Sequence, residues 1–285
     1  MTQVPVIAVI AAGDMGSGVG ARLAERGCRV LTSLAGRSPA SRARAEAAGM
    51  SDASDTHLAA ADMILSIVPP GDALALAERL APAIKVAASR PLYVDCNAVS
   101  PQTVRAIAAV AEAAGASFVD AGIIGMAPRA GYTPAIYASG PDATRFAALN
   151  AHGMDIRVMD GPVGQASALK MCYAGLTKGL HAVGVAVIRG AMEAGVDEAF
   201  LAELAQSQPQ LLDYFTRRTP GVFGKAYRWV AEMQEIGDFL GDEGEAIYDG
   251  AAALYDRMAR DHAGARTEEA ELLAFLERGA KPALK

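Results

Sequence analysis

The stretch that decides the fold is residues 161–170, which read Gly161-Pro162-Val163-Gly164-Gln165-Ala166-Ser167-Ala168-Leu169-Lys170. A glycine-rich turn here opens a long helix and places one lysine about two turns into it. Before this stretch, short apolar runs alternate with helical patterns. After it, the pattern is helical with no convincing strand. The sequence therefore predicts two domains, residues 1–162 and residues 163–285.

Continuous apolar runs predict buried strands in the first domain. Val6–Ile10 and Met63–Val68 are almost wholly apolar, as expected for parallel strands covered on both faces. Further strands are expected at 28–34, 92–95, 117–120, 135–138 and 155–159. The alternation with helices predicts an α/β Rossmann domain with a doubly wound, mostly parallel sheet. The all-α domain after it is expected to hold helices at about 165–194, 198–217, 225–240, 243–260 and 267–278.

The composition limits the classes of function. The formal net charge of −6 over 285 residues lacks the basic surface that nucleic acids require. The three cysteines, Cys28, Cys96 and Cys172, have no metal-ligand spacing, so we expect no metal site. We find no signal peptide, and no apolar run long and unbroken enough to cross a bilayer. We therefore expect a cytoplasmic protein that binds neither nucleic acid nor membrane.

The first strand leads into a glycine turn and a helix, an arrangement that suits a pyrophosphate. In register with the strand end, the fingerprint is Ala11-Ala12-Gly13-Asp14-Met15-Gly16, with alanine in place of its first glycine. A second register, 16–21, begins too late after the strand. The alternative interpretation is that this turn has only a structural role, as in a flavodoxin-type sheet. The strand–helix series behind the turn favours a nucleotide, with Ala12, Gly13, Asp14, Met15 and Gly16 in contact with it.

The type of nucleotide follows from the second strand. NAD sites usually carry an acidic residue about 20 residues past the fingerprint, but residues 29–38 contain no Asp or Glu. Arg37 and Ser38 instead supply a guanidinium and a hydroxyl that suit a 2′-phosphate. The alternative for Arg37 is a solvated surface residue that contacts no phosphate. The sequence predicts NADP, with NAD second.

Several blocks resemble the β-hydroxyacid dehydrogenases, the superfamily of 3-hydroxyisobutyrate and 6-phosphogluconate dehydrogenases. They are the first glycine loop, Val68-Pro69-Pro70, Asp95–Pro101, Val119–Met126 and Gly164–Lys170. The later segment 228–236 is similar to a divergent bacterial branch with its own helical C-terminal domain. The resemblance implies that Lys170 is the general acid/base of hydride transfer and that Val68, Pro69 and Asn97 contact the cofactor. It implies a substrate site made of Asn97, Ile124, Gly125, Met126, Thr177 and Glu232.

The proton chemistry needs an amine whose pKa is pulled toward neutrality, which burial can supply. The alternative for Lys170 is a surface lysine on an amphipathic helix. Tyr173, Thr177 and His181 follow Lys170 at helical spacing and share its face. Tyr173 replaces a family asparagine as orienter or proton donor, or packs at a domain interface. We expect His181 to be a hydrogen-bonded core or interface histidine, and Lys178 to be solvated.

The sequence departs from the family pattern at positions that usually carry small polar groups. Asn97-Ala98 stands in place of serine-threonine, Ile124 and Met126 replace a serine and a glycine, and Glu232 replaces a lysine. These departures predict a pocket that is more apolar and less anion-selective. Such a pocket suits a bulkier ketone, or an imine as in the related imine reductases. Those enzymes generally lack the lysine, so Lys170 favours the hydroxy-acid reaction.

The sequence thus predicts an NADP-dependent oxidoreductase that acts on a β-hydroxy-acid-like secondary alcohol or carbonyl. An imine reductase-like enzyme and a non-catalytic NADP-binding protein are the alternatives. Arg129 is either a further substrate contact or a solvated loop residue. We also predict a homodimer through the helical domain, because a lone monomer is expected to expose the apolar residues Trp229, Val230, Met233 and Ile236.

Overall fold

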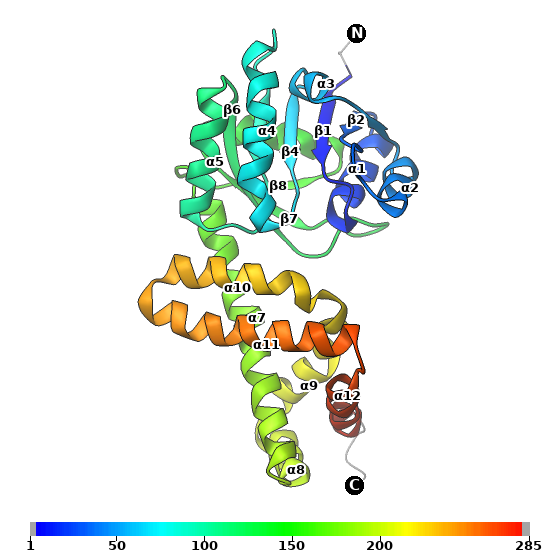
Figure 1. Ribbon diagram of the computed structural model, residues 1–285, viewed down its shortest axis with the longest axis vertical. Helices are drawn as coiled ribbons and strands as arrows, with labels where there is room; N and C mark the ends of the chain where they lie inside the picture. Colours follow the sequence, from blue (N-terminus) through cyan, green and yellow to red (C-terminus); the bar gives the residue numbers. More distant parts are fainter. Residues whose placement is uncertain (1–3, 281–285) are drawn as a thin grey trace. The chain divides into compact units, whose positions relative to one another are not determined.

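The computed structural model describes residues 4–280, which form two compact units that divide between Met171 and Cys172 (Figure 1). The division lies inside the long helix α7 (Gln165–Glu193). The sequence placed it earlier, at residue 162. The difference arises because the first two turns of α7 are hydrogen-bonded to the sheet of the first unit, so they belong with that sheet.

An eight-stranded sheet in the order β3-β2-β1-β4-β5-β6-β7-β8 forms the centre of the first unit. All neighbouring strands are parallel except β6 and β7, which are antiparallel. The sheet is therefore mostly parallel, as the sequence predicted. The strands are β1 (Val6–Ile10), β2 (Arg29–Thr32), β3 (Met50–Asp52), β4 (Met63–Ser66), β5 (Leu92–Asp95), β6 (Ser117–Ile124), β7 (Ala135–Ser139) and β8 (Asp155–Val158).

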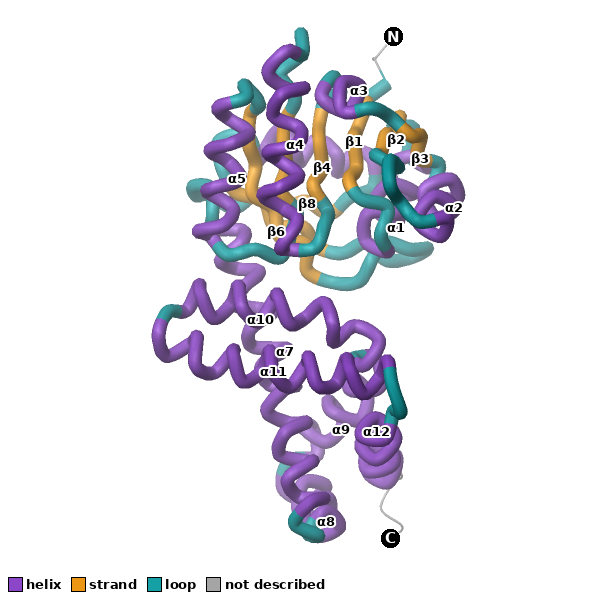
Figure 2. Tube along the Cα trace, viewed as in Figure 1, coloured by secondary structure: helices purple, strands orange, loops and turns teal. Residues whose placement is uncertain are grey.

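Helices cover both faces of the sheet, so successive residues of a central strand enter opposite cores. In β1, Ile7 and Val9 belong to one apolar cluster, and Ala8 and Ile10 to the other. The first cluster packs against α1 and α6, the second against α3, α4 and α5. Figure 2 shows α4 and α5 in front of the strands. The helices are α1 (Asp14–Glu25), α2 (Pro39–Ala47), α3 (Asp55–Ala59), α4 (Ala73–Val86), α5 (Pro101–Ala113) and α6 (Ala143–Ala147).

No pattern in the sequence predicted β3, α3, α4 or α6. Strand β3 has only three residues, and two of them are exposed, so it lacks an apolar run. Helix α4 contains Pro82, a residue that usually ends a helix. Strand β6 continues past the predicted Asp120 to Ile124, because β7 pairs with it along its whole second half.

The described residues of the second unit form helices joined by short turns, with no strand among them. The predicted helix at 198–217 is two helices, because Pro209 begins a new one and breaks the hydrogen-bond ladder. Helices α10 and α11 run back on each other through Gly241, whose φ is 79°. This arrangement buries Met233 and Ile236 fully, so the expectation that a lone monomer exposes them is wrong. After α7, the helices are α8 (Asp197–Ser207), α9 (Pro209–Arg218), α10 (Ala226–Leu240), α11 (Asp242–Ala263) and α12 (Thr267–Ala280).

One described helix, α7, is long and apolar enough to cross a membrane by length and composition. This differs from the expectation that no run of the sequence would qualify. The apolar residues of α7 are explained in part by packing, since 39% of its apolar window is buried inside the protein. Helix α7 also carries Lys178, whose ammonium pairs with Glu232.

Candidate functional site

The predicted nucleotide turn lies between β1 and α1, at the carboxyl edge of the sheet. Gly13 is the N-cap of α1, and no side chain caps this helix. A Cβ on Gly13 would meet no atom within 4 Å, whereas a Cβ on Gly16 would lie 1.8 Å from the carbonyl oxygen of Ala11. Residue 16 must therefore be glycine, and the backbone at residue 13 is open to close approach by a ligand.

The predicted phosphate-binding residues follow the neighbouring strand β2. Arg37 is exposed, and Ser38 is the N-cap of α2, where its hydroxyl accepts a hydrogen bond from the backbone N–H of Ser41 at 3.2 Å. Asp52 reaches the same strand end from β3 but accepts the N–H of Leu34 at 2.8 Å. Arg44 ties α2 to the glycine turn through the carbonyl of Ala12 at 3.2 Å.

A row of buried residues crosses the sheet beside this turn. The strand register aligns Ser66 of β4, Asp95 of β5, Asp120 of β6 and Ser139 of β7, all fully buried. Buried polar groups require hydrogen-bond partners, and here the partners come from loops and helices at the carboxyl edge. The row thus fixes the segments that follow the strands.

Asn97 joins the ends of β4 and β5. Its side-chain nitrogen donates to Ser66 Oγ at 2.7 Å and to Asp95 Oδ2 at 2.6 Å, and its Oδ1 accepts the N–H of Val68 at 2.7 Å. Both amide hydrogens are therefore used within the protein. The structure thus brings two of the predicted cofactor residues, Asn97 and Val68, into contact with each other, and Asn97 is itself buried.

Asp120 anchors the beginning of α7. Its Oδ2 accepts the N–H groups of Gly164 at 2.9 Å and Ser167 at 3.0 Å, and the hydroxyl of Ser139 at 3.1 Å. Its Oδ1 accepts the Ser167 hydroxyl at 2.7 Å. A carboxylate at a helix N-terminus also interacts favourably with the helix dipole. The start of the lysine helix is thus held by a buried acid on the sheet.

Lys170 is half-buried, and its ammonium donates a hydrogen bond to the carbonyl of Ile123 near the end of β6. The helix and strand pack closely here, because a Cβ on Gly122 would lie 2.9 Å from the carbonyl oxygen of Ala166 and 3.1 Å from Lys170 Cβ. Glycine at 122 therefore sets how near Lys170 approaches the strand. The predicted substrate residues Ile124, Gly125 and Met126 follow directly on β6.

The loop after β6 contacts the nucleotide helix. A Cβ on Gly18 of α1 would lie 3.1 Å from both Ala127 and Pro128. Gly125 has a φ of +137° and a Cβ there would lie 2.2 Å from the Tyr132 hydroxyl, so only glycine fits. Met126 is exposed. The structure thus places the predicted substrate loop beside the predicted nucleotide helix.

Arg22 of α1 holds this loop in place through several hydrogen bonds, a role that no sequence pattern indicated. Its guanidinium donates to Thr133 Oγ1 at 2.5 Å and to the carbonyls of Arg129 at 2.9 Å, Gly153 at 3.1 Å and Tyr132 at 3.3 Å. The guanidinium of Arg129 itself lies 5.7 Å from the Tyr132 ring centroid, and Arg129 is exposed. No local motif marks Arg22, because its acceptors are more than 100 residues away in the chain.

The remaining predicted residues lie in the second unit. Tyr173 is exposed on α7, and the hydroxyl of Thr177 is bonded to the Tyr173 carbonyl of its own helix at 2.8 Å. Glu232 pairs with Lys178, whose ammonium lies 4.9 Å from the Trp229 ring centroid. The prediction that Lys178 is solvated is wrong, because α10 supplies this carboxylate and ring. The charge that Glu232 brings is thus balanced within the unit.

His181 is a hydrogen-bonded core histidine, as predicted. It is 3% exposed, its Nε2 lies 3.0 Å from Thr219 Oγ1, and the rings of Tyr214 and Phe215 pack against it. Burial, together with the nearby cation of Arg218, lowers the pKa of His181 from 6.5 to about 4. The histidine is therefore neutral near pH 7.

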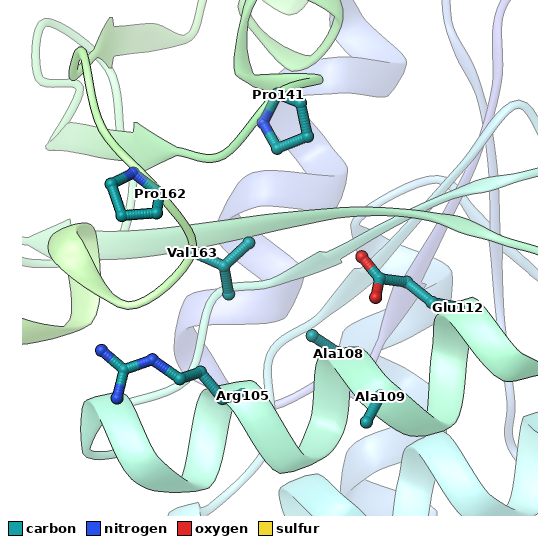
Figure 3. A pocket seen from close by; sticks show the side chains of 7 residues that line it. All are labelled: Arg105, Ala108, Ala109, Glu112, Pro141, Pro162 and Val163. Carbon is teal, nitrogen blue, oxygen red and sulfur yellow. The ribbon is translucent and has the colours of Figure 1, made fainter.

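A surface hollow of about 410 Å³ lies elsewhere on the first unit, and none of its lining residues was predicted to bind a ligand. Figure 3 shows Arg105, Ala108, Ala109 and Glu112 along α5, opposite Pro141, Pro162 and Val163. Among the described residues, no group of three His, Cys, Asp or Glu side chains is placed to hold a metal ion.

Comparison with known proteins gives matches along most of the chain. Residues 6–151 match the family model of the NAD binding domain of 6-phosphogluconate dehydrogenase, and residues 191–258 match a domain of unknown function, DUF1932. An uncharacterized 28.5 kDa protein in the 7S RNA 5′ region of Methanothermus fervidus is 31% identical over 180 residues, which are 63% of this chain and 68% of that protein.

Two of the solved structures that are similar to this chain illustrate the shared fold. A conserved protein of unknown function, described as structurally similar to 3-hydroxyacid dehydrogenases, is 32% identical, with a TM-score of 0.68 over 90% of this chain and 98% of that chain. The 3-hydroxyisobutyrate dehydrogenase of Mycobacterium tuberculosis is 18% identical, with a TM-score of 0.70 over 98% of this chain and 100% of that chain.

Proposed function

The chain belongs to the β-hydroxyacid dehydrogenase superfamily, and from this premise we propose that it is an NADP-dependent oxidoreductase acting on a β-hydroxy-acid-like alcohol or carbonyl. The first unit has the NAD(P)-binding fold of dehydrogenases and reductases. The observation that carries the proposal is the placement of Lys170. Its amine lies half-buried at the end of β6, on a helix that a buried acid holds to the same edge of the sheet as the glycine turn.

The residues of the first unit suit a dinucleotide. The uncapped N-terminus of α1 and the open backbone at Gly13 suit the pyrophosphate, with Ala12, Asp14, Met15 and Gly16 around it. Val68 and Pro69 follow β4, the strand next to β1, and Asn97 follows β5 and holds Val68 through its side-chain oxygen. When bound, the nicotinamide supplies hydride in reduction and accepts it in oxidation.

We assign NADP on the residues that follow β2. The exposed Arg37 presents a guanidinium suited to a phosphate, and Ser38 lies beside it at the start of α2. Asp52, the carboxylate that reaches this strand end, is engaged by the N–H of Leu34. An acidic partner for a ribose hydroxyl is thus replaced by a cation.

In the proposed reaction, Lys170 acts on the substrate oxygen. It donates a proton to that oxygen as hydride reaches the carbonyl carbon, and it takes the proton back when the alcohol is oxidised. The carbonyl of Ile123 orients the ammonium until substrate arrives. Ile124, Gly125 and Met126 would border the substrate, and the apolar side chains at 124 and 126 favour a substrate with an apolar group.

The experiment begins with nucleotide binding by calorimetry, comparing NADPH with NADH on the wild type and on Arg37→Ala. Arg29→Ala is the matched control, because Arg29 is also exposed but lies at the other end of β2. We expect a preference for NADPH that is lost in Arg37→Ala and kept in the control. Equal binding of both nucleotides would overturn the assignment of NADP, and no binding would overturn the oxidoreductase.

Turnover tests the role of the lysine. β-Hydroxy acids, their keto forms and cyclic imines are screened with wild type, Lys170→Met and the control Lys85→Met, whose lysine is exposed on α4. We expect hydroxy-acid turnover to fall by roughly 10²–10⁴-fold in Lys170→Met alone. Imine reduction that survives Lys170→Met would favour an imine reductase. Tight binding without turnover on any substrate would favour a non-catalytic protein. We expect the enzyme in the cytoplasm.

A further inference from the structure

Tyr132 places its hydroxyl against the backbone of the predicted substrate loop. This hydroxyl accepts a hydrogen bond from the N–H of Met126 at 3.2 Å. A Cβ on Gly125 would clash with the same oxygen, so the glycine leaves the space that the hydroxyl fills. The phenol thus reaches the loop at the two residues that follow β6, although Tyr132 itself lies outside the motif Val119–Met126. No sequence pattern indicated this position.

The backbone of Tyr132 is held by hydrogen bonds on both sides. Its N–H donates to the carbonyl of Arg129 at 2.9 Å, and its carbonyl accepts the N–H of Arg129 at 3.0 Å. The guanidinium of Arg22 donates to both carbonyls, at 2.9 Å for Arg129 and 3.3 Å for Tyr132. A phenol on a backbone fixed in this way is ordered before a ligand arrives, so little conformational entropy is lost when it binds one.

The Tyr132 hydroxyl can donate as well as accept. A tyrosine hydroxyl accepts hydrogen bonds through its oxygen and donates one through its hydrogen. Here the oxygen accepts from Met126, and the hydrogen is donated to no group in the part of the chain that the structure describes. The side chain is half-buried rather than enclosed, so a small molecule can reach it. The phenol is therefore able to donate one hydrogen bond to a ligand at the substrate loop.

The separation of this hydroxyl from Lys170 suits a short hydroxy acid. The Lys170 ammonium bonds the carbonyl of Ile123, and the Tyr132 hydroxyl lies at residues 125 and 126 of the same segment. Two to three residues of extended backbone span about 7–10 Å. A β-hydroxy acid has three carbon atoms between its hydroxyl and carboxylate oxygens, about 3–5 Å, and a hydrogen bond of about 2.8 Å at each end extends this to roughly 9–11 Å. One such molecule can therefore contact both groups.

The charge around the loop favours an acid. Arg129 is the only charged residue in the segment 121–134, and its guanidinium lies 5.7 Å from the Tyr132 ring centroid. Lys170 adds a second cation at the end of β6. These two cations favour a negatively charged ligand, and a carboxylate accepts a phenol hydrogen bond more strongly than a neutral oxygen does. The acceptor that fits this donor best is thus a carboxylate.

We propose that the hydroxyl of Tyr132 donates a hydrogen bond to the carboxylate of a β-hydroxy acid whose alcohol oxygen is held by Lys170. The proposal rests on the reaction proposed above, and it adds the residue that selects the acid end of the substrate. Ile124 and Met126 offer no side-chain hydroxyl, and Tyr132 brings one to the loop from outside the motif.

The test is the oxidation of β-hydroxybutyrate and β-hydroxyhexanoate by NADP⁺ in wild type and Tyr132→Phe. Phenylalanine keeps the ring and removes only the hydroxyl. We expect kcat/KM to fall roughly 10- to 100-fold through KM, with kcat little changed, because a hydrogen bond to a charged group is lost in ground state and transition state alike. Tyr137→Phe is the matched control, since the hydroxyl of Tyr137 accepts instead from Arg157 at 3.2 Å.

The methyl esters of the same acids separate binding of the carboxylate from support of the loop. The esters lack the negative charge, so we expect Tyr132→Phe to lower their kcat/KM by less than about five-fold. Equal losses on acids and esters would show that the hydroxyl only supports the N–H of Met126, and would overturn the proposal.

Two further outcomes separate this proposal from the reaction on which it rests. Wild-type kinetics of Tyr132→Phe on the acids would overturn the role of Tyr132 and leave the proposed reaction standing. A wild type that oxidises none of the acids or esters would overturn the proposed reaction, and the role of Tyr132 with it.

Discussion

Asp120 illustrates how much of the candidate site depends on one side chain. Four donors, two from backbone and two from serine hydroxyls, converge on its carboxylate at the start of α7. Asp120 belongs to the sequence motif Val119–Met126, but the residues that donate to it from α7 and the turn before it, Ser167 and Gly164, lie 47 and 44 residues further along the chain. Position in the chain gives no indication of such a contact, so its role became visible only in the fold.

Replacing Asp120 by asparagine tests this anchor. The amide places two hydrogens where donors already point, so at least one donor loses its acceptor. We expect the free energy of unfolding to fall by about 2–4 kcal/mol. The measurement is urea unfolding followed by circular dichroism, with Asp160→Asn as control because Asp160 is exposed close before α7. Equal stability of the two variants would contradict the anchor.

His181 gives a prediction about pH. Its pKa is about 4 in the folded protein and 6.5 in the unfolded chain, so the unfolded chain binds more protons between these values. The contribution of the neutral ring to stability is full above pH 6.5 and is lost as the pH falls toward 4. The loss is on the order of 3 kcal/mol.

The measurement is the free energy of unfolding of wild type and His181→Gln at two pH values. One is pH 7.5, above the pKa of the unfolded chain, and the other is pH 4.5, close to the pKa of the folded protein. We expect the difference between the two proteins to shrink at the lower pH. His57→Gln is the control, since His57 is exposed on α3. A difference that is the same at both pH values would contradict the assignment.

At the scale of elements, the clamp between α1 and the loop after β6 joins the predicted nucleotide helix to the predicted substrate loop. The four acceptors of Arg22 require a planar guanidinium, because a lysine ammonium cannot span them. We expect Arg22→Gln to free the loop and to speed tryptic cleavage after Arg129 at least about ten-fold. Cleavage sites are identified by mass spectrometry.

Arg22→Lys is expected to give an intermediate rate of cleavage after Arg129, because lysine keeps the positive charge but lacks the planar guanidinium with its several N–H donors. The control is Arg29→Gln, which removes an exposed arginine outside the clamp. If the cleavage rate after Arg129 is the same in wild type and Arg22→Gln, Arg22 does not hold the loop.

For the whole molecule, the division into two units predicts where NADPH protects the chain. We expect the largest slowing of amide hydrogen exchange in the first unit, at residues 11–16, 36–38 and 66–69. At about 100 times its dissociation constant, NADPH should stabilise the folded state by about 2.7 kcal/mol. Exchange is followed by mass spectrometry with NADH as the comparison. Slowing confined to the second unit would contradict the assignment of the nucleotide turn.

The sequence predicted those elements that depend on the pattern of neighbouring residues in the chain. The strands β1 and β5 have the predicted bounds because each is a short run of mostly apolar residues that begins directly after a proline, Pro5 or Pro91. Gly164 and Lys170 marked the long helix correctly. The pairing of Lys178 with Glu232 could not be predicted, since these residues are 54 positions apart. Nor could the burial of Met233 and Ile236, because it depends on α11 folding back along α10.

The continuity of α7 has a consequence for anyone who wishes to split the gene. A fragment that ends before Gly164 keeps the sheet, but the Asp120 carboxylate then loses three of its four hydrogen-bond donors. A fragment that begins at Cys172 starts inside a helix, with its first N–H groups deprived of their carbonyls. Neither cut yields two self-sufficient halves. Two-plasmid complementation and domain grafting are therefore better attempted at a surface turn such as Gly264, with α7 left whole.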